Sequence, residues 1–488
     1  MTEESKNTRL SRIALRGTGW HFMSFFGGRM FSFISTVILA RLLLKDDFGL
    51  VGYAVTFISF LEVMSTFGVN LAVIYHKESD ENSNASFWLS MLVGVILFSV
   101  TFVAAPFVGE FFNDTRVIPI VRALGGNFLF YALSNTHVSL LKKKLAFGHS
   151  VIADMAGSVF KAIVSISLAF MEYGPWSLVW GQLAGNAVST ILFWIILPWR
   201  PSFHFDFLAA RSLLSYGVKS MSVDFVSILS SNIDYVLIGR YLGAEVLGVY
   251  TLAFRLPELL IGGVARVTSN VVFPVLTHIK GSSGDLSRGV YMITQYVSLV
   301  TVPLGVGLAL VAEPLILVIF TEKWIELVPI MQAIAIFSTL NTLDYYVGTL
   351  FKTEGVPQIL TWLGVVHLCF LIPSFIWAVV FVKSVLLVAW LHTLISFLLG
   401  ILTVFIATKR STVSWGGMIN SLRPSFFAVL PMILIVILVM RLSEDLNIYL
   451  HLCLSTFSGA LTYITVLWFT QRELLLDVYS RVVKAILK

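Results

Sequence analysis

Long apolar segments recur along most of the chain, from Gly17 to Thr470, and few polar residues interrupt them. We count about 14 such segments of roughly 18–28 residues, each long enough to cross about 30 Å of hydrocarbon as an α-helix. The predicted spans are 17–40, 48–75, 85–108, 117–140, 150–171, 175–197, 213–239, 246–276, 289–314, 327–351, 358–382, 385–408, 425–442 and 447–470. The pattern predicts an all-α integral membrane protein.

The composition supports this interpretation, because 57% of the 488 residues are hydrophobic and 12% are charged. Soluble domains contain about 25% charged residues, so the chain lacks the polar surface that a soluble fold requires. About 20 basic residues fall on one side of the predicted spans and about 7 on the other, which places both termini in the cytoplasm. The net charge of +6 follows from this bias, and we expect no nucleic-acid partner.

Single charged residues lie deep inside several apolar segments. They are Arg29, Glu62, Lys161, Asp224, Arg255, Glu258, Arg266 and Asp344. A charge at this depth is costly unless it faces protein or water, so such residues usually mark the route of an ion or a polar cargo. The chain is therefore predicted to be a transporter.

Helical spacing places several of these residues on common faces. A polar stripe about 16 Å long on the span 246–276 consists of Arg255, Glu258, Gly262 and Arg266. Pro257 within this stripe should kink or loosen the helix. A second stripe, on the span 327–351, consists of Asn341, Asp344 and Gly348. Together the stripes predict a shared wet interior; the alternative is that the small polar residues only mediate helix packing.

Two halves of the sequence repeat one pattern, in which an arginine ends a span, an acidic turn follows, and a glycine lies near the start of the next span. The aligned pairs are Arg41 with Arg240, Asp46 with Glu245 and Gly49 with Gly248. Six predicted helices separate the copies, and an even number predicts a parallel repeat about an axis along the membrane normal. Chance similarity between two loops is the alternative.

We therefore expect two parallel six-helix repeats followed by two C-terminal helices. The predicted parts are a bundle over 1–200, a bundle over 201–410, two additional spans within 411–470, and a cytoplasmic amphipathic tail over 471–488. In the tail, apolar and basic residues alternate, which is typical of a helix lying on a membrane surface.

Several segments resemble one protein family. They are 39–43 (LARLL), 47–53 (DFGLVGY), 65–70 (STFGVN) and 232–250 (NIDYVLIGRYLGAEVLGVY). They are similar to bacterial polysaccharide flippases of the Wzx type, in particular the colanic-acid exporters. This family belongs to the superfamily of multidrug and toxin extruders and lipid II flippases. The resemblance covers about residues 10–350 well, and the rest only by its number of helices.

The resemblance implies a flippase that moves an undecaprenyl-pyrophosphate-linked oligosaccharide across the bacterial inner membrane by alternating access. Such a flippase would serve exopolysaccharide or lipopolysaccharide synthesis beside a polymerase and a chain-length regulator. Desolvated arginines bind pyrophosphate well, so the predicted substrate-binding residues are Arg29, Lys161, Arg255, Arg266 and Asn341. The predicted ion-coupling residues are Glu62, Asp224, Glu258 and Asp344.

Other functions remain as alternatives at this point. One is a drug or cation extruder of the same superfamily, which the embedded arginines disfavour because they repel cations. Another is a membrane glycan polymerase or ligase, which would need larger external loops. The sequence has no G-x-x-x-x-G-K loop and no H-E-x-x-H pair, so we expect no enzyme and no cofactor other than a coupling H⁺ or Na⁺.

Overall fold

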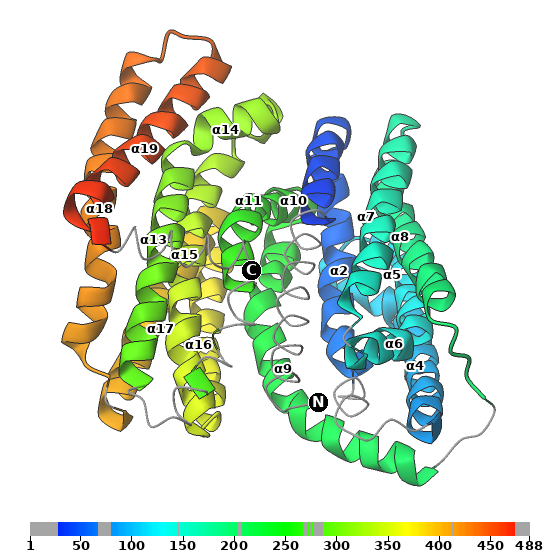
Figure 1. Ribbon diagram of the computed structural model, residues 1–488. Helices are drawn as coiled ribbons and strands as arrows, with labels where there is room; N and C mark the ends of the chain where they lie inside the picture. The colour runs from blue at the N-terminus through cyan, green and yellow to red at the C-terminus, as the bar shows by residue number, and fades with distance from the viewer. Residues whose placement is uncertain are drawn as a thin grey trace. The chain divides into compact units, whose positions relative to one another are not determined.

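The computed structural model describes residues 28–66, 80–144, 146–202, 207–266, 272, 276–277, 286–411 and 413–473, with the backbone alone at 66, 80–81, 147 and 207–224. The elements within these residues are helices, as predicted (Figure 1). Twelve of the helical segments are long and apolar enough to span a membrane. The chain divides into a first unit, Met1–Gly248, and a second unit, Val249–Lys488. The predicted boundaries at 200, 410 and 470 remain predictions.

The first unit is a bundle of long helices. It contains a helix over 28–42, α2 (Lys45–Thr66), α4 (Asp80–Phe112), α5 (Val117–Gly125), α6 (Asn127–Lys143), α7 (Phe147–Phe170), α8 (Pro175–Ile196), α9 (Phe207–Leu242) and the start of α10 (Ala244–Ala253). Figure 1 shows α9 as a long, bent helix. The predicted spans 17–40 and 213–239 overlap the 28–42 helix and α9, but both extend beyond the described side chains, and the twelve segments come from the described residues alone. The predicted total of 14 spans is therefore not confirmed.

Small residues let α7 and α8 pack closely in this bundle. A Cβ atom added to Gly181 would overlap the hydroxyl of Ser165, and one added to Gly185 would lie 2.8 Å from the carbonyl oxygen of Gly157. Such contacts are typical of membrane helices, because lipid provides no hydrophobic force to bring helices together and close packing must do so.

The repeated turns meet each other within the first unit. A Cβ atom on Gly49 would overlap the carbonyl group of Ala244, and one on Gly248 would overlap the carbonyl oxygen of Lys45. The offset that aligns Gly49 with Gly248 also aligns Lys45 with Ala244, so the contact is reciprocal: each glycine packs against the partner of the other. Two-fold related surfaces make contacts of this kind. The geometry thus supports a two-fold relationship between the repeated turns.

The second unit continues from α10. It contains α11 (Arg255–Pro257), a π-helix η1 (Glu258–Gly262), α13 (Leu286–Leu310), α14 (Ala312–Ile319), η2 (Glu322–Trp324), α15 (Leu327–Glu354), α16 (Gln358–Ile376), η3 (Trp377–Val382), α17 (Val385–Arg410), α18 (Trp415–Leu442) and α19 (Ile448–Thr470). The last two helices pair with each other and pack on α13, where the Tyr463 hydroxyl donates to the Leu299 carbonyl at 3.0 Å. The predicted tail over 471–488 lies outside the described residues from 474 onward.

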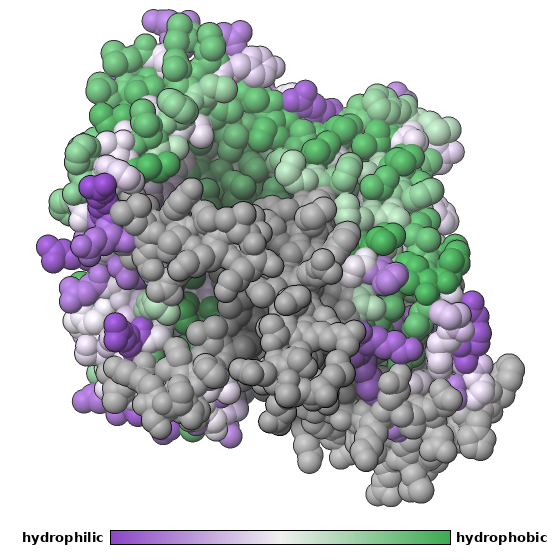
Figure 2. Space-filling model, viewed as in Figure 1, coloured by the Kyte–Doolittle hydropathy of each residue, from purple (hydrophilic) through white to green (hydrophobic). Residues whose placement is uncertain are grey.

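Apolar side chains cover wide areas of the surface. Figure 2 shows them over much of the described part of the visible face, with polar residues gathered near its margins. Phe469, for example, leaves 82% of its surface uncovered by protein. A soluble protein rarely exposes apolar patches of this extent, so the surface is suited to lipid.

Candidate functional site

A break in the helix that begins at Ala244 shapes the candidate site. The regular helix α10 ends at Ala253, one turn of α11 follows, and the π-helix η1 begins at Glu258, directly after Pro257. Proline cannot donate a backbone hydrogen bond and its ring disturbs the preceding turn. The predicted loosening at Pro257 is therefore observed. Single turns of π-helix are rare, and they occur frequently at functional sites.

A pocket of about 280 Å³ lies between this broken segment and α15, entirely inside the second unit. The broken segment contributes Phe254, Glu258, Gly262, Ala265 and Arg266 to its wall. Two predicted site residues, Glu258 and Arg266, thus face one pocket. Their side chains form an ion pair.

The opposite wall is one face of α15. It consists of Phe337, Ser338, Asn341, Thr342 and Tyr345. The positions 338, 341, 342 and 345 follow the spacing that places residues on one side of a helix. The predicted residue Asn341 therefore faces Glu258 and Arg266 across the pocket, and hydroxyl and aromatic groups surround it.

Asp344 lies on another face of α15. Its carboxylate Oδ1 would be 3.9 Å from a Cβ atom added to Gly400 of α17, and the Thr403 side chain lies beside it. It does not line the pocket. Its predicted role in ion coupling remains a prediction.

The ion pair between Glu258 and Arg266 is open to the pocket. The side chains are 43% and 50% exposed, respectively. Gly262 provides space for this arrangement, because a Cβ atom there would lie 2.9 Å from Glu258 Oε2. No other charged residue lines the pocket among the described residues. The wall therefore combines one positive and one negative charge and has no net charge.

A second polar group lies in the first unit, around the predicted residue Lys161. Its ammonium group donates a hydrogen bond to Gln182 Oε1. Gln182 Nε2 donates to Asn186 Oδ1 at 3.4 Å, and Asn186 Nδ2 donates to Asn127 Oδ1 at 2.8 Å. The four side chains come from α6, α7 and α8, and they form a chain of amides that ends at a cation.

The remaining predicted residues are not gathered in either group. Arg29 is half-buried in the helix over 28–42, while Glu62 of α2 and Arg255 of α11 are exposed. The side chain of Asp224, in α9, lies outside the described side chains. Their roles in binding and coupling therefore remain predictions.

The hydroxyl and aromatic residues of the pocket are absent from the residues predicted to bind substrate. Ser338, Thr342 and Tyr345 share the helical spacing of Asn341, so a search for one polar face of span 327–351 would have found them. Phe254 and Phe337 carry no such signal. Many other phenylalanines of the apolar segments are exposed on the protein surface. The sequence alone does not separate a phenylalanine that lines a pocket from one that faces outward.

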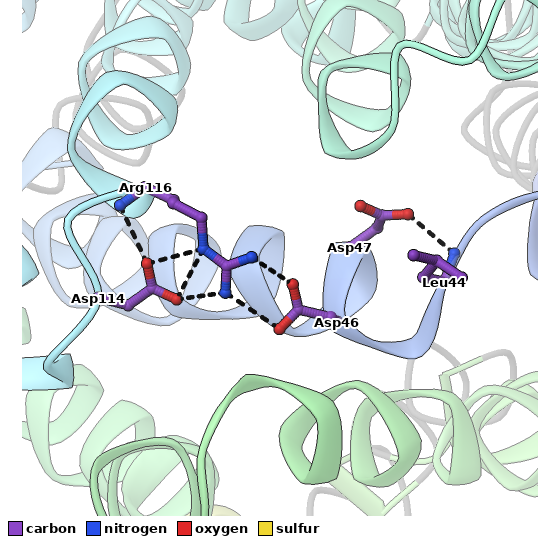
Figure 3. A network of polar contacts seen from close by, with 5 residues as sticks. All are labelled: Leu44, Asp46, Asp47, Asp114 and Arg116. Carbon is purple, nitrogen blue, oxygen red and sulfur yellow. Dashed lines mark hydrogen bonds and ion pairs between the residues drawn. The ribbon is translucent and has the colours of Figure 1, made fainter.

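A further polar network occupies the turns at one end of the first unit (Figure 3). Arg116 contacts Asp46 and Asp114, each at 2.7 Å. These hydrogen bonds raise the pKa of the Arg116 guanidinium and lower the pKa of the Asp114 carboxyl below its usual range. Beside them, Asp47 Oδ2 accepts a hydrogen bond from the backbone N–H of Leu44 at 2.8 Å. The network connects the start of α2 to the turn between α4 and α5.

Comparison with known proteins identifies relatives of the chain. Residues 38–329 match the family model described as polysaccharide biosynthesis protein. The teichuronic acid biosynthesis protein TuaB of Bacillus subtilis (strain 168) is 28% identical over 70% of this chain and 72% of its own. The succinoglycan biosynthesis transport protein ExoT of Rhizobium meliloti (strain 1021) is 22% identical over 95% of this chain and 94% of its own.

A solved structure shares the fold. The lipid II flippase MurJ, in an inward closed conformation, superposes with a TM-score of 0.75 over 93% of this chain and 99% of its own, at 15% sequence identity. This agreement confirms the expected fold class, a bundle of membrane-spanning helices. The family model spans more than half of the chain, and it includes the repeated turns and the broken helix with Glu258 and Arg266. The chain belongs to the polysaccharide biosynthesis protein family.

Proposed function

We propose that the protein is a flippase that moves an undecaprenyl-pyrophosphate-linked oligosaccharide from the cytoplasmic to the outer leaflet of a bacterial inner membrane. The glycan would be a repeating unit for exopolysaccharide or lipopolysaccharide synthesis. A polymerase and a chain-length regulator would act on it afterwards. The protein itself would move the substrate without making or breaking a covalent bond.

The observation that carries this proposal is the pocket of the second unit. It places an arginine, an amide, two hydroxyl side chains and aromatic rings in membrane-spanning segments. Polar residues at such depth are costly and usually mark the route of a polar cargo. Membership of a polysaccharide biosynthesis family supports a lipid-linked glycan as this cargo.

The pocket suits both polar parts of a lipid-linked glycan. Arg266 can bind a phosphate group through two parallel hydrogen bonds, since its guanidinium is planar and carries several donors. Asn341, Ser338 and Thr342 can exchange hydrogen bonds with sugar hydroxyl groups. The polyprenyl chain can remain in the lipid, next to the apolar surface of the protein, while the polar head group crosses the membrane.

A transport assay tests the proposal directly. The purified protein is reconstituted in liposomes with a short-chain polyprenyl-pyrophosphate-linked oligosaccharide. The measured quantity is the rate at which glycan of the inner leaflet becomes accessible to an external glycosidase, with and without a pH gradient. We expect rapid exposure with the wild-type protein and at least a tenfold slower rate with Arg266→Ala, the equivalent of about 1.4 kcal/mol in the barrier.

Arg441→Ala is the matched control, because Arg441 is an exposed arginine at the end of α18 that does not line the pocket. Its rate should equal that of the wild-type protein. If the glycan is instead lengthened or transferred to another molecule, the protein is an enzyme and the proposal is wrong. Equal rates for Arg266→Ala and the wild-type protein would reject the pocket as the transport site.

A further inference from the structure

The Glu258–Arg266 ion pair faces the space that the substrate must enter. Both partners line the pocket, and both side chains are about half exposed toward it. A phosphate that binds Arg266 through two parallel hydrogen bonds needs the Nη2 group that now contacts Glu258. An incoming phosphate and the Glu258 carboxylate compete for one guanidinium.

The charges decide what happens to the displaced carboxylate. A pyrophosphate that is esterified at both ends carries about two negative charges. With Glu258 ionised, the pocket would then hold about three negative charges against the one positive charge that its described lining residues carry, that of Arg266. Like charges a few ångströms apart repel strongly in surroundings of low polarity, and an ionised carboxylate that loses its partner there favours its neutral form.

We propose that the ion pair couples substrate binding to proton uptake: the pyrophosphate of the cargo displaces Glu258 from Arg266, and Glu258 then takes a proton from solution. The step forms one O–H bond on the carboxylate and needs no other reactant. Release of the cargo restores the ion pair and returns the proton. This inference rests on the proposed function and assigns its coupling ion.

The other titratable groups around Glu258 do not offer the same exchange. Tyr345 lines the pocket from α15, and the hydroxyl of Tyr346 donates to the backbone carbonyl of Ala265 at 3.4 Å. Asp344 is turned toward Gly400. Arg255 lies on the same broken segment but does not line the pocket. Among the described residues, Glu258 is the carboxylate that contacts the phosphate-binding arginine.

Glu258 can leave Arg266 because 43% of its side chain is exposed and it lines the pocket. The missing side chain of Gly262 leaves the space that Glu258 Oε2 occupies in the ion-paired state. The carboxylate can therefore leave Arg266 by rotation of its side chain, without movement of a packed helix.

Proton uptake on binding is the measurement that tests the inference. The probe is a short-chain polyprenyl-pyrophosphate-linked disaccharide, whose doubly esterified pyrophosphate does not titrate near neutral pH. Calorimetry in buffers of different ionisation enthalpy gives the number of protons taken up, and repetition at several pH values gives Kd. For the wild-type protein we expect about one proton per bound ligand, with Kd rising by up to about tenfold per pH unit.

Glu258→Gln keeps the shape of the side chain and removes its charge. We expect this variant to bind the probe more tightly at pH 8, with no proton uptake and a Kd that does not vary with pH. Glu313→Gln, at an exposed position of α14, should retain the uptake of the wild-type protein. If Asp344→Asn abolishes proton uptake and Glu258→Gln does not, the assignment to Glu258 is wrong.

The outcomes also separate this inference from the proposed function. Binding and flipping without proton uptake would overturn the coupling by Glu258 and leave the flippase intact. If the folded wild-type protein neither binds nor moves the probe, the proposed function fails, and the inference fails with it.

Discussion

Gly262 controls how closely Glu258 can approach Arg266. A methyl group at this position would lie 2.9 Å from Glu258 Oε2, which is the end of a flexible side chain and can move. We expect Gly262→Ala to weaken the ion pair and to lower the Kd of the lipid-linked pyrophosphate by about 3- to 10-fold, a change of about 0.7–1.4 kcal/mol. Calorimetric titration measures the change.

Gly416→Ala is the control for Gly262→Ala, since nothing lies within 4 Å of a Cβ atom added there. Both variants gain helix propensity from alanine, so their unfolding temperatures should remain close to that of the wild-type protein. Weaker binding by Gly262→Ala would show that the added methyl group excludes the ligand itself and that competition by Glu258 is not what limits affinity.

Asp114 contributes to stability in a way that depends on pH. Hydrogen bonds from Arg116 lower the pKa of its carboxyl, while the carboxyl of an unfolded chain titrates near about 3.9. The stabilisation is therefore complete above that value and disappears as the pH falls through the lower pKa of the folded state. Because Arg116 is 58% exposed, we expect about 0.5–1 kcal/mol at pH 7.

The test compares unfolding temperatures of the wild-type protein and Asp114→Asn in detergent. The variant should unfold at a lower temperature at pH 7, and the difference should shrink toward pH 3. Asp445→Asn, in the exposed turn between α18 and α19, serves as the control. A difference between wild type and Asp114→Asn that is constant with pH would mean that shape, and not charge, accounts for the effect.

At the scale of the elements, the contact between the repeated turns leaves the least space for a larger side chain. Gly49 and Gly248 each pack directly on backbone carbonyl groups, which cannot move aside as a side chain can. Overpacking typically costs about 1–3 kcal/mol, so we expect Gly49→Ala and Gly248→Ala to destabilise the protein by at least this amount. Thermal unfolding in detergent measures the loss, with Gly416→Ala as the matched substitution in open space.

If the contact is reciprocal, the two glycine variants should have similar effects, and the double variant should cost less than the sum of the two. Residues in contact are not additive, because the first displacement already makes space for the second. Full additivity would indicate that the two glycines act in separate places and would weaken the case for a two-fold relationship.

The repeat and the helix break could be recognised in the sequence because each depends on few residues. An arginine, an acidic turn and a glycine recur at one offset, and Pro257 acts on the backbone of its own helix. The pocket face of α15 was only partly recognised. Asn341 was identified, but charge drew attention to Asp344, which faces α17. The face that lines the pocket is defined by its partner helix, and no pattern within α15 specifies that partner.

The interruption of span 117–140 shows the same limit. It was predicted as one helix, but the structure divides it into α5 and α6 at Gly126. The adjacent Gly125 packs against Thr101 of α4, where a Cβ atom would lie 2.8 Å from Thr101 Cγ2. The hydropathy of a segment predicts the length of a span. It does not predict a break such as this one, which depends on contacts with a neighbouring helix.

At the scale of the whole molecule, α9 decides how the chain is threaded through the membrane. It has 36 residues, of which the side chains of 225–242 are described, and this described part is shorter than the predicted span 213–239. If α9 crosses, an even number of helices separates Thr115 from Asp445, and both turns face the same side. If it does not cross, the number is odd, and the two turns face opposite sides.

Labelling of single cysteines distinguishes these arrangements and tests the predicted orientation. The two native cysteines, Cys369 and Cys453, are replaced by serine, and one cysteine is introduced at a time in intact cells. A membrane-impermeant maleimide should label Thr115→Cys and Asp445→Cys from outside, while Lys144→Cys and Ser411→Cys react only after the membrane is opened. With one crossing each by the helix over 28–42 and by α19, this result places both termini in the cytoplasm, as the excess of basic residues predicts. Labelling of Thr115→Cys without Asp445→Cys would mean that α9 does not cross, and the second unit, with its pocket, would then be inverted relative to the prediction.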